Sequence, residues 1–155
     1  GISVRDLRTV LEAVADAAPR SKDAAWLVES ARRRLARQIT ARAAGADGVV
    51  RALALDRATE ETLRQTLGAS DGEPALAPDV ELARRLVASL EAGATRLTTA
   101  GNPVVVLAPP DLRRPLWDFA SRFVPDLLVV TARELVPGTA VEPAGTLQAQ
   151  AQLVA

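Results

Sequence analysis

Two short, uninterrupted apolar runs late in the chain place the strongest limit on its fold. Residues 104–108 and 127–131 consist almost entirely of valine and leucine, which is typical of strands buried on both faces of a parallel sheet. Between them, a helical pattern begins after Pro109 and Pro110. Because parallel strands need a long crossover, usually a helix, this order predicts a β–α–β unit.

Patterns before this unit add further elements. We expect a strand over 49–55, a helix that Asp56 caps and that ends near Leu67, and an amphipathic helix over 78–100 that begins at a proline. Residues 68–74, rich in glycine, serine and aspartate, predict a loop. The part of the chain after the first helices is therefore expected to be a small α/β subdomain of three to four strands.

Proline positions limit the last helix and the last strand. Pro115 lies within the helical pattern that follows Pro110, and a helix tolerates it only near the first turn, where its missing N–H is not needed. Residues 139–147 predict an edge strand, because Pro143 cannot donate a hydrogen bond to a central ladder. Residues 148–155 have little to hold them and predict a flexible tail.

The start of the chain carries the pattern of an amphipathic helix. Ser3 and Asp6 have the spacing of a helix start, so the helix should begin near Val4, and Pro19 ends it. Apolar residues recur at three- and four-residue spacing and define the expected core face: Val4, Leu7, Val10, Leu11 and Val14.

A second helix is expected over 24–43, with Asp23 as its N-cap. The glycines within 45–48 then mark a change of pattern. We therefore expect an α+β or α/β fold in which a helical subdomain, 1–46, precedes the α/β subdomain, 47–147.

Composition excludes several kinds of site. The chain has no cysteine and no histidine, which excludes disulfides, the usual zinc sites and the commonest general base. Its 19 basic and 19 acidic side chains give a formal net charge of zero, which argues against nucleic-acid binding despite an arginine-rich second helix. The basic side chains are in excess in residues 1–45 and the acidic ones in the remainder, an asymmetry that could favour packing between copies. No apolar run approaches the roughly 20 residues of a membrane span.

The amino-acid sequence of the expected first helix is unusual. Residues 2–14 read I-S-V-R-D-L-R-T-V-L-E-A-V and are followed by A-P at 18–19. This string resembles the FHIPEP family of type III secretion export-gate proteins, whose cytoplasmic domains carry V-S-I-R-D-L-R-T-I-L-E-A-L and then A-P. Segments similar to the family continue over 27–39, 105–114 and 123–135, so the resemblance covers nearly the whole chain.

The resemblance implies the carboxy-terminal part of a cytoplasmic domain at the inner face of the bacterial inner membrane. In the family, these domains form a homo-oligomeric ring that receives export substrates, chaperones and soluble export components. It implies no enzyme activity, no cofactor and no nucleic acid, and contact with the membrane only through an amino-terminal domain. Residues 141–147 favour the flagellar branch, with the injectisome branch as the alternative.

Four side chains of the helical subdomain are candidates for contacts with other subunits or partners. Arg5, Asp6 and Arg8 could form ion pairs within or between subunits. Trp26 lies just after the N-cap of the second helix, where it can remain partly exposed as an interface anchor.

A different class of function remains open, that of a small doubly wound hydrolase or nucleotide-using enzyme. Its site would lie at the carboxyl ends of the strands, around 108–111 and 131–134, with Asp111 and Glu134 as the acids. A pocket in which both carboxylates converge would favour the enzyme.

Overall fold

The computed structural model describes residues 6–149, which are organised around a four-stranded sheet whose neighbouring strands all run parallel. The strand order is β5–β4–β1–β6. The strands are β1 (Val50–Leu55), β4 (Val105–Leu107), β5 (Leu128–Val130) and β6 (Val141–Leu147). From β4 the chain passes through helix α6 (Pro110–Ala120) to the adjacent β5. The expected β–α–β unit and the mixed helical and α/β fold class are thus confirmed.

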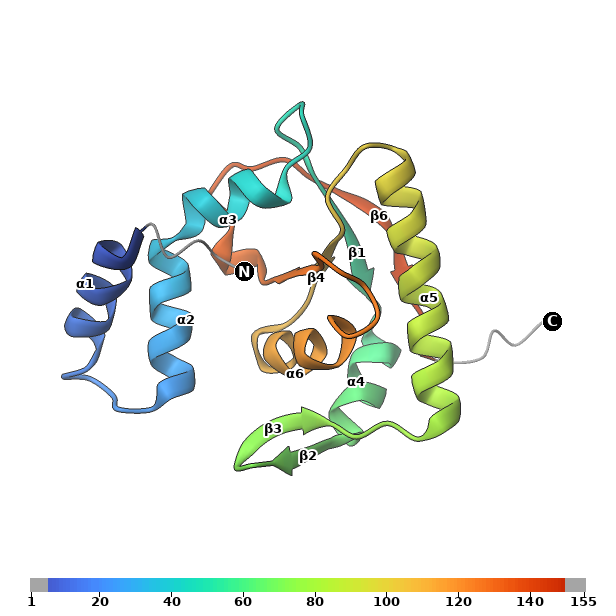
Figure 1. Ribbon diagram of the computed structural model, residues 1–155, viewed down its shortest axis with the longest axis horizontal. Helices are drawn as coiled ribbons and strands as arrows, with labels where there is room; N and C mark the ends of the chain where they lie inside the picture. Colours follow the sequence, from blue (N-terminus) through green and yellow to red (C-terminus); the bar gives the residue numbers. More distant parts are fainter. Residues whose placement is uncertain (1–5, 150–155) are drawn as a thin grey trace.

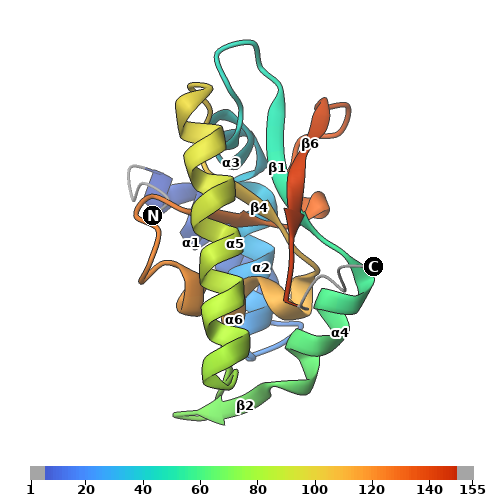
Figure 2. The same ribbon diagram turned by 90° about the vertical axis from the view of Figure 1, so that its right-hand side faces the viewer.

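Helices cover both faces of this sheet (Figures 1 and 2). The face that carries Leu53 packs against three helices. These are α4 (Arg57–Gln65), α5 (Val80–Thr99) and α6. The opposite face, which carries Ala52, packs against α3 (Ala36–Ala43). Because successive side chains of a strand point to opposite faces, β1, β4 and β5 contribute to both apolar clusters, whereas β6 contributes to the first alone.

Aspartate side chains cap two helices of the α/β part, α4 and α5. The Asp56 carboxylate accepts a hydrogen bond from the Thr59 N–H at 2.7 Å, which confirms its predicted role as an N-cap. Asp79 caps α5 in the same way at 2.8 Å. Helix α5 therefore begins after Asp79, two residues later than the expected start at Pro78.

The expected loop over 68–74 is wrong, because this stretch forms an antiparallel hairpin. Strands β2 (Leu67–Ser70) and β3 (Glu73–Leu76) pair directly. The two residues between them, Asp71 and Gly72, have φ values of 52° and 81°. A two-residue hairpin turn with both φ values positive favours the Asp-Gly pair, so a local signal for the hairpin was present in the sequence.

The expected single helix over 24–43 is divided. Helix α2 (Ala24–Arg34) ends at Leu35, where φ is −90° and ψ is 14°, and α3 begins at the next residue. The predicted N-cap at Asp23 is confirmed by a 2.9 Å hydrogen bond from the Ala25 N–H. The break lets α2 pack against α1 (Leu7–Ala17) while α3 covers the sheet, and Leu35 is buried in the cluster beneath α3.

Helix α1 buries only part of the expected face: Val10 and Val14 are half-buried, and Val10 packs against the core. Leu7 and Leu11 are 53% and 59% exposed, whereas Ala13 and Ala17 are buried. The reason is that α1 packs beside α2 (Figure 1) through its small side chains, which allow a close approach. The predicted helix start at Val4 and the cap at Ser3 lie outside the described residues.

The two prolines behave differently. Pro143 lies on β6, an outer strand of the sheet, as expected. Pro115 lies in the second turn of α6 rather than the first, and the helix nevertheless continues to Ala120. Its ring is buried, so packing offsets the hydrogen bond that the helix loses there.

The first two residues after β6 are held by side chains. The Gln148 N–H donates to the Ser89 hydroxyl, and the N–H of the buried Ala149 donates to the Thr59 hydroxyl. The remainder of the expected tail, 150–155, lies outside the described residues. Among residues 6–149, no helix combines the length and apolarity that crossing a membrane requires.

Candidate functional site

The candidate contact residues of α1 differ in how they are engaged. The half-buried Asp6 accepts hydrogen bonds from the Thr9 hydroxyl at 3.1 Å and from the Gln38 side-chain amide. Arg8 is exposed and forms a 2.8 Å ion pair with Glu12 on the same helix. Arg5 lies outside the described residues. The structure therefore makes Asp6 a link between α1 and α3 and leaves Arg8 on the surface.

Trp26 lies at the seam between α1 and α2. It lines a shallow hollow there with Ala13 and Ala17, and the Arg20 guanidinium carbon lies 5.7 Å from its ring centroid. This distance is that of a cation–π contact. The ring is half-buried rather than enclosed, so part of it remains available at the surface.

The two acids of the enzyme alternative do not converge. Arg64 binds the Asp111 carboxylate with both its Nε, at 2.6 Å, and an Nη, at 3.2 Å, and this hydrogen bonding lowers the pKa of the Asp111 carboxyl. Glu134 is almost completely buried among other partners. The hollow at the carboxyl ends of the strands is lined by neither acid. The arrangement gives no support to the expected pair of catalytic carboxylates.

Glu134 instead belongs to a group of four charges, of which Arg113 and Glu134 are buried, and we name it the Glu134 cluster: Glu29, Arg32, Arg113 and Glu134. One oxygen of Glu134 accepts a hydrogen bond from Arg32 Nε, and the other accepts from the Thr131 N–H at 2.8 Å. Arg113 Nε lies 3.8 Å from Glu134 and donates to Glu29 at 3.0 Å. The cluster thus ties α2 to α6 and to the short 3₁₀ helix η2 (Ala132–Glu134).

The Glu134 cluster was not expected, although one part of it has a local signal. Thr131 and Glu134 form a capping box, with hydrogen bonds in both directions. The T-x-x-E spacing is a known signature of this motif. Arg32 and Glu134 are 102 positions apart, and a contact at that separation leaves no local trace in the sequence.

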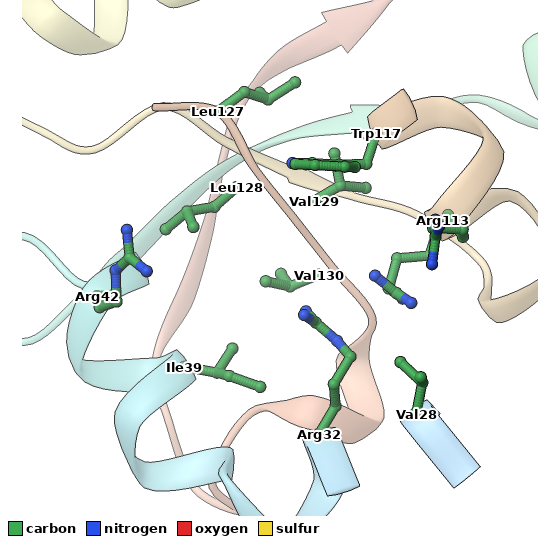
Figure 3. A pocket seen from close by; sticks show the side chains of 11 residues that line it. Val28, Arg32, Ile39, Arg42, Arg113, Trp117, Leu127, Leu128, Val129 and Val130 are labelled. Atoms are coloured by element: carbon green, nitrogen blue, oxygen red, sulfur yellow. The ribbon is translucent and has the colours of Figure 1, made fainter. Parts of the chain in front are cut away.

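A cleft with a volume of about 330 Å³ lies next to the Glu134 cluster. Helices α2 and α3 form one wall, α6 forms the other, and β5 with the residue before it forms the floor (Figure 3). Its lining residues are Val28, Arg32, Ile39, Arg42, Arg113, Arg114, Trp117, Leu127, Leu128, Val129 and Val130. The lining is apolar at the floor and carries arginines on both walls. This cleft could not be predicted from the sequence, because its walls come from distant segments.

The family is decided by comparison with known proteins. The sequence matches the profile of the FHIPEP family over residues 1–140. The chain belongs to the FHIPEP family. This is the family of type III secretion export-gate proteins that the opening helix resembles, so that resemblance is confirmed.

FHIPEP relatives come from both branches of type III secretion. The flagellar biosynthesis protein FlhA of Salmonella typhimurium is 35% identical over 135 residues, which cover 86% of this chain and 19% of FlhA. The invasion protein InvA of the same species is 30% identical over 146 residues, 94% of this chain and 21% of InvA. The chain therefore spans about a fifth of the length of these curated relatives.

The fold agrees with the family. A chain in the solved structure of the Chlamydia pneumoniae CdsV and CdsO protein complex superposes with a TM-score of 0.81 at 27% identity. The match covers 94% of this FHIPEP chain and 43% of that chain. The helical region, the parallel sheet and the hairpin are thus a known arrangement.

Proposed function

We propose that this chain is a cytoplasmic segment of a type III protein export gate, part of a homo-oligomeric ring that docks export substrates, chaperones and soluble export components. The observation that carries the proposal is the family match over residues 1–140. The similarity to a chain in a complex with CdsO supports docking of a soluble component. As part of this proposal, we assign the parent protein to the cytoplasmic face of the bacterial inner membrane and its membrane contact to a domain outside this segment.

The exposed leucines of α1 are the best candidates for the ring contact. Leu7 and Leu11 are both more than half exposed, and the charge excess of residues 1–45 is opposite to that of the remainder. Such a charge distribution favours a head-to-tail contact between different surfaces of two copies, which closes into a ring when the rotation allows it. The occupant of the α1 face is therefore proposed to be a second copy of this protein.

We propose that Arg8 and Trp26 extend this contact surface. Arg5 is included because it belongs to the sequence string at residues 2–14 that resembles the family. Asp6 has a positioning role in this proposal, since its carboxylate is already engaged by Thr9 and Gln38. We further propose that 1–46 and 47–147 act as the helical and α/β subdomains of this unit, with a tail beyond.

An export assay tests the function. The gene for the full-length parent protein is deleted in its native host and restored either intact or with the segment removed, and the secreted proteins are measured. We expect the intact gene to restore export and the deleted segment to abolish it. Loss of flagellar filament protein would support the favoured flagellar branch, and loss of host-directed effectors alone would support the injectisome branch. Normal export without the segment would contradict the proposal.

A further inference from the structure

Strand β5 is an outer strand of the sheet whose second edge borders the cleft. It pairs with β4 alone among the described strands. The Leu128 N–H donates to Val104 at 3.0 Å, and the Val130 carbonyl accepts from Ala108 at 2.9 Å. In a parallel ladder, the residue between two such bonded residues directs its N–H and C=O away from that neighbour. The backbone polar groups of Val129, a residue that lines the cleft and is only 3% exposed, therefore point away from β4.

An outer strand with unpaired backbone groups is a template for pairing with another chain. Proteins usually protect such edges with charges, prolines or a covering element. The edge of β5 is short, with three residues, but it contains neither charge nor proline. The cleft keeps the walls of α3 and α6 apart on either side of this edge. A strand that entered the cleft would direct alternate side chains toward these two walls.

The two walls differ from the floor in charge. Four arginines line the cleft, and no acidic side chain does. Arg32 and Arg113 are bound within the Glu134 cluster, and Arg114 pairs with Glu73 and Asp118. Arg42, at the exposed rim, forms no ion pair with any residue in the range 6–149. A ligand for this cleft should therefore carry negative charge near Arg42.

Apolar groups supply the remaining chemistry. Trp117 on α6 and Ile39 on α3 stand on opposite sides of the cleft (Figure 3), and Trp117 is 38% exposed. A volume of about 330 Å³ is at the lower end of ligand pockets. The space suits a few side chains of an extended segment rather than a folded helix, which is about 10 Å wide.

We propose that the free edge of β5 binds an extended segment of a partner protein, with alternating apolar and acidic residues, by strand addition. The segment forms backbone hydrogen bonds with Val129, places apolar side chains beside Trp117 and Ile39, and places a carboxylate beside Arg42. This inference rests on the proposed docking role only for the source of the partner. The binding itself requires neither a ring nor export.

The probe for the test is a fluorescent six-residue peptide that alternates valine and glutamate. Its binding to the full chain is followed by anisotropy, and exchange of the Val129 amide is followed by NMR. We expect the peptide to slow exchange at Val129. Methylating the backbone nitrogens on the peptide edge that faces β5 should weaken binding about fivefold, which corresponds to one net hydrogen bond of about 1 kcal/mol. A peptide methylated on its opposite edge is the control and should bind like the unmethylated one. Unchanged exchange at Val129, or equal binding of the two methylated peptides, would overturn the proposal.

Charge variants supply the second readout. Arg42→Glu should weaken binding of the acidic peptide by about fivefold and improve binding of a valine–lysine peptide, within the range of exposed ion pairs. Arg37→Glu is the matched control, because Arg37 is an exposed arginine of α3 that does not line the cleft. It should change the affinity less than twofold. Equal effects of the two variants would show general attraction to a basic helix and would also overturn the proposal.

Two other occupants have their own signatures. A chain truncated after residue 149 that binds the peptide much more tightly would show that residues 150–155 occupy the cleft. Self-association that the peptide reverses would show that a second copy occupies it. Either result overturns the partner-segment proposal. Ring formation with an unprotected Val129 amide would reject this inference alone, whereas protection of Val129 in a protein dispensable for export would reject only the proposed function.

Discussion

Helices α1 and α5 carry leucines at similar helical spacing but bury them very differently. Leu86, Leu90 and Leu97 of α5 are at most 3% exposed, whereas Leu7 and Leu11 of α1 are more than half exposed. The α5 helix lies along the sheet (Figure 2), and α1 lies at the far side of α2 (Figure 1). The comparison teaches that periodicity identifies an apolar face but does not identify what covers it. In α5 the cover is the sheet of the same chain, and in α1 we assign it to another subunit.

The largest expected effect concerns the Glu134 cluster, which joins α2 of the helical region to α6 and η2 of the α/β region. Glu134→Ala leaves Arg32 and Arg113 without their buried carboxylate, so it should lower the free energy of unfolding by about 3–5 kcal/mol. Urea unfolding followed by circular dichroism measures this. Glu12→Ala is the control, because the exposed Arg8–Glu12 pair should contribute less than about 0.5 kcal/mol. A similar loss of unfolding free energy in both variants would mean that the cluster does not hold α2 to α6 and η2.

The leucines themselves allow a direct comparison. Leu90→Ala should lower the free energy of unfolding by about 2–5 kcal/mol, because it removes buried methyl groups and leaves a cavity. Leu11→Ala should change it by less than about 0.5 kcal/mol in the isolated chain, since its side chain is exposed. The same urea titration compares both variants. A large effect of Leu11→Ala would place that leucine in the core and remove the contrast between the helices.

Helix-cap substitutions test whether the helical region of α1 and α2 unfolds together with the α/β region. Asp79→Ala and Asp23→Ala each remove a carboxylate that accepts a backbone N–H, a loss of about 1 kcal/mol. If the chain unfolds as one unit, both substitutions should shift the whole transition equally, whether it is followed by Trp26 or by Trp117 fluorescence in single-tryptophan variants. A shift confined to Trp26 in Asp23→Ala would show that α1 and α2 unfold separately.

The smallest effect concerns pH at the junction between α3 and β1. Hydrogen bonding to Arg51 is the main cause that lowers the pKa of Asp47 from 3.8 to about 2. Since the pKa is depressed in the folded state, the stabilisation is present above the unfolded value and is lost as pH falls through the folded one. The Asp47 carboxyl should therefore titrate near pH 2 by NMR. In Arg51→Ala the pKa should return toward 3.8, and an unchanged pKa would assign the shift to another cause.

Much of the fold was readable because its signals are local. Asp23 and Asp56 cap their helices through neighbouring N–H groups, and the apolar runs at β4 and β5 are fully contained in their own segments. The hairpin at Asp71 and Gly72 was also readable, although these residues were interpreted as part of a loop. The break at Leu35 was not, because it follows from the separate surfaces that α2 and α3 must cover.

Less of the candidate site could be predicted, since its parts meet only in three dimensions. The sequence of residues 2–14 indicated the family, but it did not show that Leu7 and Leu11 lie on the surface. The cleft requires α3, α6 and β5 to be adjacent, and nothing in any one of these segments indicates the other two. The enzyme alternative made Glu134 a catalytic acid at the carboxyl ends of the strands, whereas its contact with Arg32 makes it a buried structural group.

The central claim is that the leucine face of α1 is a contact between copies. The mass of the complete cytoplasmic domain of the parent protein, measured by mass photometry, tests it most directly. We predict a ring for the unaltered protein and a monomer for Leu11→Glu. Val80→Glu is the control, because Val80 on α5 is an apolar residue that is even more exposed than Leu11, and it should retain the ring. A ring of unchanged mass and stability in Leu11→Glu would contradict the account.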